Sequence, residues 1–252
     1  MINVGVIGYG YWGPNLVRNL AEVSRVKLTA VADSSPEKLA LVQRRFPAVT
    51  TTADYQDLIR DPSIDAIAVA TPVSTHFELG MAVLKAGKHL WLEKPMTETS
   101  LQARQLLEEA EKRKLILFVD HTFVYTGAVR KMQEIVASGE LGKILYYDSS
   151  RVNLGLFQHD VNVIADLGDH DFSILDHLLK EHPNAVSAAG INTATGKLAS
   201  AAATRTVAPR RDSTFSSVPV STSRQRRGPR SAPTSSAVSP QRAARRSGLA
   251  AP

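Results

Sequence analysis

Apolar runs rich in β-branched residues alternate with amphipathic stretches through the first 120 residues. The apolar runs are INVGVI (2–7), KLTAVA (27–32), DAIAVA (65–70), HLWLE (89–93) and LILFV (115–119). Helical spacing of apolar residues marks the segments 14–23, 36–46, 54–60, 75–86 and 99–113, the last with Ser100 as its expected N-cap. Because continuous apolar runs are typical of strands buried on both faces, these repeated units predict an α/β fold with a doubly wound parallel sheet.

The pattern changes after about residue 120. The sequence predicts a helix over 125–138, a long strand over 143–152, a helix over 162–180 and a strand over 185–191. Two strands are too few for a self-standing sheet. We therefore expect a Rossmann domain at 1–120, an incomplete α/β domain at 121–196 and a tail at 197–252.

The tail differs from the rest of the chain in charge and composition. Residues 1–196 carry 19 Lys and Arg against 23 Asp and Glu, whereas residues 197–252 carry 11 against 1. The tail is rich in Ser, Arg, Ala and Pro and poor in apolar residues, which predicts disorder. Nucleic-acid binding is not expected, because the Arg residues are scattered and Phe215 is the only aromatic residue among them. A frameshift in a GC-rich gene is a further hypothesis for this segment.

The composition excludes several classes of protein. The chain contains no cysteine, which rules out disulfides, thiolate nucleophiles and cysteine metal sites. No uncharged apolar run approaches the roughly 18 residues that span a bilayer, and the N-terminus lacks the basic segment of a signal peptide. A cytoplasmic protein without membrane contact is expected.

Gly8-Tyr9-Gly10-Tyr11-Trp12-Gly13 directly follows the first predicted strand and opens a helix. This is the setting that a dinucleotide-binding fingerprint requires. Gly8 permits the tight turn, Gly10 lets the backbone approach a pyrophosphate and Gly13 allows close packing of helix on strand. Free N–H groups at the helix start complete the expected cofactor site, to which Tyr11 and Trp12 also belong. The alternative is an ordinary glycine turn of an α/β protein.

Asp33 ends the second predicted strand, 20 residues after Gly13. A carboxylate at this place accepts both hydroxyls of a ribose and repels a 2′-phosphate, which favours NAD over NADP. Ser34 belongs to the same expected site, and Lys38 weakens the preference through its positive charge. The alternative role of Asp33 is to cap the helix that begins near Pro36.

Two further motifs end predicted strands and are expected to face the same crevice. Ala70-Thr71-Pro72 follows DAIAVA, with His76 one helical turn later, and Glu93-Lys94-Pro95 follows HLWL. The carboxyl ends of parallel strands line the ligand crevice, so we assign these residues to the cofactor site. A lysine at this edge is suited to stabilising charge on a substrate oxygen. Taken alone, His76 and Lys94 are equally consistent with ordinary surface or capping residues.

Asp166 and His170 are i, i+4 neighbours on one predicted helix. Such an Asp orients an imidazole and supports its charged form, and histidine suits proton transfer near neutral pH. The alternatives are a capping or buried histidine and a metal site, but no second well-spaced ligand supports a metal. We therefore expect no bound metal.

In this combination and order, VGVIGYGYWG, VADSS, VATPVSTH, LEKP and the Asp166/His170 pair resemble the Gfo/Idh/MocA family, named after glucose–fructose oxidoreductase and inositol dehydrogenase. The resemblance covers residues 1–195. The segments DHTFVYTGAVRKM and YYDSSRVNLGLFQHDVNVIADLGDHD resemble the branch acting on nucleotide sugars.

The resemblance implies hydride transfer between a nicotinamide cofactor and a secondary alcohol of a sugar or cyclitol. Lys94 would contact the reacting hydroxyl, His170 would be the general acid/base and Asp166 would support it. The residues expected on the substrate side are His121, Arg151, Asn153, Asp160 and Asn162. Their alternative role is polar loop or strand-face structure.

Family members usually continue with several more strands, which complete the sheet and an oligomer interface. On this ground we expect weak or no turnover, no certain homo-oligomer and a tendency to aggregate. A non-catalytic NAD-binding sensor or scaffold is the first alternative function, and a nucleotide-binding protein with a basic tail for nucleic acid is the second.

Overall fold

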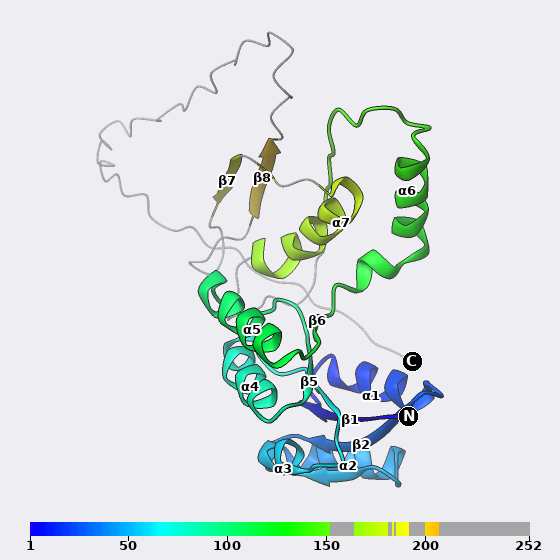
Figure 1. Cartoon of the computed structure of the whole chain (residues 1–252), viewed down its shortest axis with the longest axis vertical. Helices are drawn as coiled ribbons and strands as arrows, with labels where there is room; N and C mark the ends of the chain where they lie inside the picture. The colour runs from blue at the N-terminus through cyan, green and yellow to red at the C-terminus, as the bar shows by residue number, and fades with distance from the viewer. Residues whose placement is uncertain (152–163, 181–182, 184, 192–199, 207–252) are drawn as a thin grey trace, which may run out of the picture. The chain divides into compact units, whose positions relative to one another are not determined.

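The computed structural model describes residues 1–151, 164–180, 183, 185–191 and 200–206. Six parallel strands form one sheet in the order β3-β2-β1-β4-β5-β6 (Figure 1). They are β1 (Ile2–Ile7), β2 (Val26–Ala32), β3 (Thr50–Thr52), β4 (Ala66–Val69), β5 (His89–Leu92) and β6 (Leu117–Val119). This strand order reverses between β1 and β4, where doubly wound sheets bind their ligands. The predicted doubly wound parallel sheet is confirmed.

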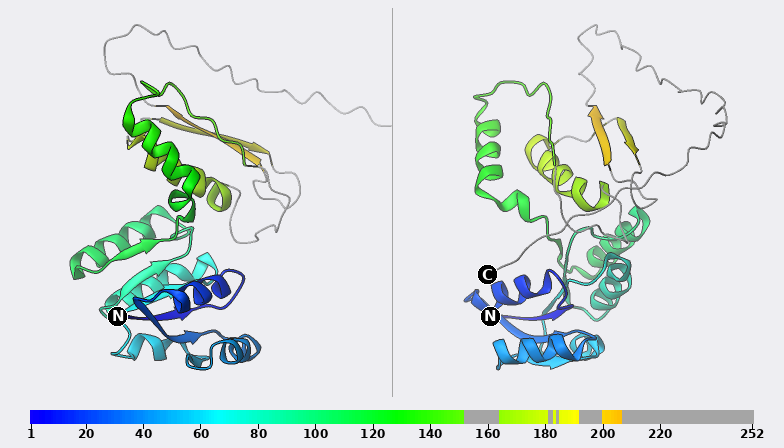
Figure 2. Two further views of the ribbon diagram at one scale, coloured as in Figure 1. Left: turned by 90° about the vertical axis from the view of Figure 1, so that its right-hand side faces the viewer. Right: turned by 180° about the vertical axis from the view of Figure 1, so that it is seen from behind.

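Helices connect the strands and cover both faces of the sheet. They are α1 (Gly13–Glu22), α2 (Pro36–Arg45), α3 (Tyr55–Arg60), α4 (Val73–Lys85) and α5 (Ser100–Arg113). In Figure 1, and again in the right-hand view of Figure 2, α1 lies on one side of β1 while α4 and α5 lie on the other. No helix within the described ranges is long and apolar enough to cross a membrane.

Each face of the sheet has its own apolar core. Leu16 and Val17 of α1 and Val42 of α2 pack with Val6 and Val31 of the strands. The opposite core is built from α3, α4, α5 and the alternate strand residues, among them Leu58, Val83, Leu106, Ile67 and Leu92. Because the strands are buried on both faces, they read as continuous apolar runs in the sequence.

Two details of this region differ from the prediction. No strand is predicted over Thr50–Thr52, because TTT carries no apolar pattern. β3 forms there by pairing with β2 at the edge of the sheet. The N-cap of α5 is Thr99, not Ser100. The Thr99 side chain accepts from the Gln102 backbone N–H, and the Gln102 side chain accepts in return from the Thr99 N–H. This reciprocal capping box starts the helix at Ser100, one residue earlier than an N-cap at Ser100 would.

The segment after β6 begins with a short 3-10 helix, η1 (Thr122–Tyr125), followed by α6 (Gly127–Ser138). A π-helical turn, η2 (Ile164–Gly168), runs directly into α7 (Asp169–Leu179). Val129 of α6 packs with Ile174 and Leu178 of α7, and Phe123 of η1 adds to this core. The helices predicted over 125–138 and 162–180 therefore exist, although the second begins as a π-helical turn.

Two predictions for the later part of the chain are corrected. No strand forms over 143–151, the described part of the predicted strand 143–152. Leu145 and Tyr146 are each 84% exposed, so this β-prone segment has no described neighbour to supply ladder hydrogen bonds. The strand predicted over 185–191 is β7 (Ala185–Ile191), but it pairs antiparallel with β8 (Ser200–Thr206), inside the segment predicted to be disordered. Backbone pairing with β7 orders this small-residue segment despite its composition. The rest of the tail lies outside the described residues.

Candidate active site

The glycine turn joins β1 to α1 at the point where the strand order reverses. Gly8 has a φ of +99°, and a Cβ there would lie 2.6 Å from the Ala70 carbonyl oxygen. A Cβ on Gly13 would collide with the Gly8 carbonyl oxygen. Gly10 differs, because a Cβ there would meet no atom within 4 Å. Gly8 and Gly13 therefore shape the turn, while Gly10 leaves its backbone open to approach by a ligand at the start of α1.

Asp33 connects this turn to the end of β2. Its Oδ2 accepts from the Tyr9 backbone N–H at 2.7 Å, and its Oδ1 accepts from the Ser35 N–H at 2.9 Å. The Lys38 ammonium lies 3.5 Å from Oδ2. Ser35, not Asp33, caps α2 by accepting from the Lys38 N–H. The carboxylate therefore fixes the backbone of the glycine turn, a contact that the sequence analysis did not anticipate.

The other predicted cofactor residues lie around the same edge of the sheet. Tyr11, Trp12 and Ser34 are exposed, and Ala70 is buried where β4 ends. The Glu93 N–H donates to the Val69 carbonyl, which sets the loop after β5 beside the loop after β4. The structure therefore brings the predicted cofactor motifs together.

His76 has a different setting from the one its motif suggests. Its side chain is buried, and each ring nitrogen contacts a backbone carbonyl oxygen, Thr71 O at 2.9 Å and Pro95 O at 3.0 Å. Both nitrogens are therefore engaged by the loops after β4 and β5.

Lys94 meets Asp166 across 72 residues of sequence. Its Nζ donates to Asp166 Oδ1 at 2.9 Å and to the Asp166 backbone carbonyl at 2.8 Å. Residues 164–168 form a π-helical turn where a regular α-helix was predicted, and such turns are often found at functional sites. The Asp166 carboxylate accepts from Lys94, and its charge also favours the charged form of His170, as predicted for this pair.

His170 lies in the first turn of α7. Burial lowers its pKa to about 4, with the charges of Lys94 and Arg151 adding to the effect and Asp166 and Asp171 opposing it. The ring centroid lies 4.6 Å from that of Phe123. Its Nδ1 makes no hydrogen bond within the described residues. His170 is therefore a neutral imidazole near pH 7, in the state that accepts a proton.

Arg151 is held beside His170 rather than free. Its guanidinium makes two hydrogen bonds to the Asp171 carboxylate, at 3.1 and 3.0 Å, and lies 4.6 Å from the centre of the Phe123 ring. Burial raises the pKa of Asp171, but the hydrogen bonds from Arg151 and Ser149 outweigh it and the pKa is lowered. The Arg151–Asp171 ion pair therefore lies near the His170 imidazole and influences its pKa.

Three carboxyl groups near this edge, those of Glu93, Asp120 and Asp169, have pKa values that the sequence did not predict to be shifted. Burial raises the pKa of Glu93 to about 8, the neighbouring Asp120 carboxyl raises it further, and Lys94 opposes the shift. Burial likewise raises the pKa of Asp120 and of Asp169. Asp169 Oδ2 lies 3.4 Å from His121 Nδ1. Asp120 directly follows β6, so its position at a strand end was a usable signal.

Three predicted substrate-side residues, Asn153, Asp160 and Asn162, lie outside the described residues. The described residues contain no cluster of three or more histidine or carboxylate side chains with the geometry of a metal site.

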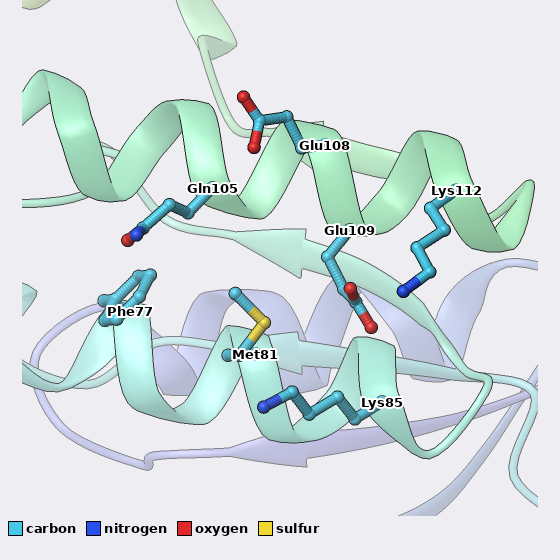
Figure 3. A pocket seen from close by; sticks show the side chains of 7 residues that line it. All are labelled: Phe77, Met81, Lys85, Gln105, Glu108, Glu109 and Lys112. Atoms are coloured by element: carbon cyan, nitrogen blue, oxygen red, sulfur yellow. The ribbon is translucent and has the colours of Figure 1, made fainter.

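A groove in the described part of the chain lies elsewhere. It measures about 520 Å³ and lies between α4 and α5 (Figure 3). Its lining residues are Phe77, Met81, Lys85, Gln105, Glu108, Glu109 and Lys112. None of them is a predicted site residue, and the Glu109 carboxylate is paired with Arg113. The predicted site residues that the structure describes therefore lie outside this groove.

The chain is similar in sequence to known oxidoreductases. Residues 2–121 match the model of an oxidoreductase family with an NAD-binding Rossmann fold. The chain is 28% identical over 194 residues to myo-inositol 2-dehydrogenase of Thermotoga maritima, a match that covers 75% of this chain and 58% of that protein. It is 39% identical over 128 residues to D-xylose 1-dehydrogenase (NADP(+)) of Hypocrea jecorina, covering 49% of this chain and 33% of that protein.

The fold is also similar to solved structures. GenD2 from gentamicin A biosynthesis, solved in complex with NAD, superposes with a TM-score of 0.68 at 25% identity, covering 78% of this chain and 59% of GenD2. The chain spans about half the length of the relatives it matches.

Proposed function

The chain belongs, through residues 2–121, to the Gfo/Idh/MocA oxidoreductase family, and from this premise we propose that it is an NAD-dependent dehydrogenase. The proposed substrate is a secondary alcohol of a sugar, cyclitol or nucleotide sugar. The observation that carries the proposal is the hydrogen-bonded pair of Lys94 and Asp166, which joins the loop after β5 to the turn that precedes His170.

The residues at the sheet edge fit a nicotinamide dinucleotide. The open backbone at Gly10 and the start of α1 suit the pyrophosphate. The carboxylate of Asp33 suits ribose hydroxyls and repels a 2′-phosphate, although the nearby Lys38 reduces this discrimination. A nicotinamide cofactor bound there would supply the hydride acceptor for oxidation of the substrate alcohol.

Lys94 and His170 have different roles in the proposed reaction. The Lys94 ammonium, held by Asp166, donates to the substrate hydroxyl oxygen and stabilises negative charge that develops there. His170 is neutral because of its lowered pKa, so it takes the hydroxyl proton as the hydride leaves. His121 and Arg151 are proposed to contact the substrate, with Arg151 restricted by its ion pair with Asp171.

Calorimetric titration of the full chain with NAD and with NADP tests the cofactor part of the proposal. We expect tighter binding of NAD. Gly10→Val should weaken binding by at least about tenfold without loss of the fold, because the new side chain fills space open to the cofactor. Gly127→Val is the matched control, since a Cβ at Gly127 also meets nothing within 4 Å but lies at the start of α6. Absence of heat with both cofactors would contradict the proposal.

A turnover assay tests the chemistry. NADH formation is followed with myo-inositol, D-xylose and a uridine diphosphate sugar as substrates. Lys94→Ala and His170→Ala should abolish the rate while NAD binding persists. NAD binding without turnover on every such substrate would favour the non-catalytic NAD-binding alternative.

A further inference from the structure

His76 occupies the first turn of α4 and is 1% exposed. Its Nδ1 lies 3.0 Å from the Pro95 carbonyl oxygen, and its Nε2 lies 2.9 Å from the Thr71 carbonyl oxygen. Both partners are backbone carbonyl oxygens, which only accept hydrogen bonds.

A neutral imidazole carries one N–H and one nitrogen lone pair. It can therefore donate to one of the two carbonyls, while its lone pair faces the lone pairs of the other. The imidazolium has two N–H groups and can donate to both. Because the side chain is buried, solvent cannot supply a donor to the unmatched carbonyl at low cost.

The two carbonyls belong to the loops that end β4 and β5. Pro95 directly follows Lys94, whose ammonium meets Asp166. We propose that His76 is a positioning residue for Lys94: in its doubly protonated form it joins the two loops, and loss of one proton releases one of them. This inference rests on the proposed function only where it assigns Lys94 a role in the reaction.

The charges along the elements that His76 contacts are Glu78 and Lys85 on α4 and Glu93, Lys94 and Glu98 in the loop after β5. In the part of the chain that the structure describes, none of them forms an ion pair or hydrogen bond with His76. The Pro95 and Thr71 carbonyls are therefore the described groups that two ring protons of His76 would meet.

Nitrogen NMR of histidine-labelled full chain, without cofactor, reports how many ring nitrogens carry a proton. Across a pH series, we expect loss of one of the two His76 ring protons to coincide with a fall of about tenfold in hydrogen-exchange protection of the Lys94, Met96 and Thr97 amides, after correction for the intrinsic pH dependence of exchange. His89 is the internal control for the NMR signals. Its Nδ1 accepts from the Ile116 N–H at 3.0 Å, so this nitrogen carries no proton while that hydrogen bond is present.

Variants separate the contact of His76 with Pro95 from its contact with Thr71. The amide nitrogen of His76→Asn matches Nδ1, so this variant should keep the Lys94 loop protected at every pH. The amide nitrogen of His76→Gln matches Nε2, so this variant should hold Thr71 and leave the Lys94 loop about tenfold less protected. His89→Gln should leave the Lys94 loop unchanged.

Two results would overturn the inference. One is a His76 ring with a single proton throughout the pH range, and the other is equal protection of the Lys94 loop in the Asn and Gln variants. Both measurements use the protein without cofactor. Failure to bind NAD would therefore refute the proposed function and leave this inference standing.

Discussion

Lys94 lies among groups whose charge states depend on burial. Glu93, Asp120 and Asp169 have raised pKa values because burial disfavours their charged forms, and His170 has a lowered one for the same reason. Titratable groups with opposite shifts around one cation are typical of sites that move protons.

Glu93→Gln should remove a pH dependence of stability. The folded pKa of Glu93 is about 8, above the ordinary 4.5, so the folded state keeps a proton that the unfolded state releases. Stability therefore falls as pH rises from 4.5 to about 8, and the glutamine variant should lose most of this slope. Denaturant unfolding at a series of pH values measures it, with the exposed Glu140→Gln as control. An unchanged slope would show that Glu93 ionises normally.

His170 should contribute a slope of opposite sign. Its folded pKa of about 4 lies below the ordinary 6.5, so between these values the unfolded state binds a proton that the folded state does not. Stability therefore rises with pH over that range. We expect His170→Gln to lack this rise and the ring protons of wild-type His170 to titrate near pH 4 by NMR. Titration at or above the ordinary value would mean that the ring is hydrated.

Among the elements, α5 shows how local sequence sets a boundary. Thr99 and Gln102 satisfy each other's backbone N–H groups at the start of the helix. Ser100, although a good capping residue type, is already the first helical residue. The capping box therefore prevails over residue type alone.

Thr99→Ala should lower the free energy of unfolding by about 1 kcal/mol, because one orphan N–H at the helix start loses its acceptor. Ser100→Ala is the matched control and should change stability much less, since alanine is favoured inside helices. Chemical denaturation of both variants measures the difference. An equal loss in the two variants would contradict the capping role of Thr99, and a larger loss in Ser100→Ala would place the cap at Ser100.

At the scale of the whole molecule, the sheet edge and the helix η2–α7 meet through Lys94 and Asp166. Both side chains are partly buried, at 20% and 25% exposure. A charge-assisted hydrogen bond in such a setting couples two distant segments of the chain.

A double-mutant cycle tests this coupling. Lys94→Met and Asp166→Asn should each destabilise the protein, and together they should cost less than the sum of the two, with an interaction energy of about 1 kcal/mol or more. The cycle Lys131→Met and Glu134→Gln is the control, since that pair on α6 is well exposed. Additive effects at Lys94 and Asp166 would mean that the two segments do not interact in solution.

The sequence by itself determined the Rossmann sheet and most of its motifs, because buried parallel strands and a glycine turn impose local patterns on residues that are close in the chain. Tertiary structure alone decided that Asp166 contacts Lys94, that Asp33 fixes Tyr9, that His76 joins two loops and that 143–151 forms no strand. These outcomes depend on which segments meet in space and on how deeply a charge is buried. Neither the contacts between distant segments nor the burial of a charge produces a periodic pattern in the sequence.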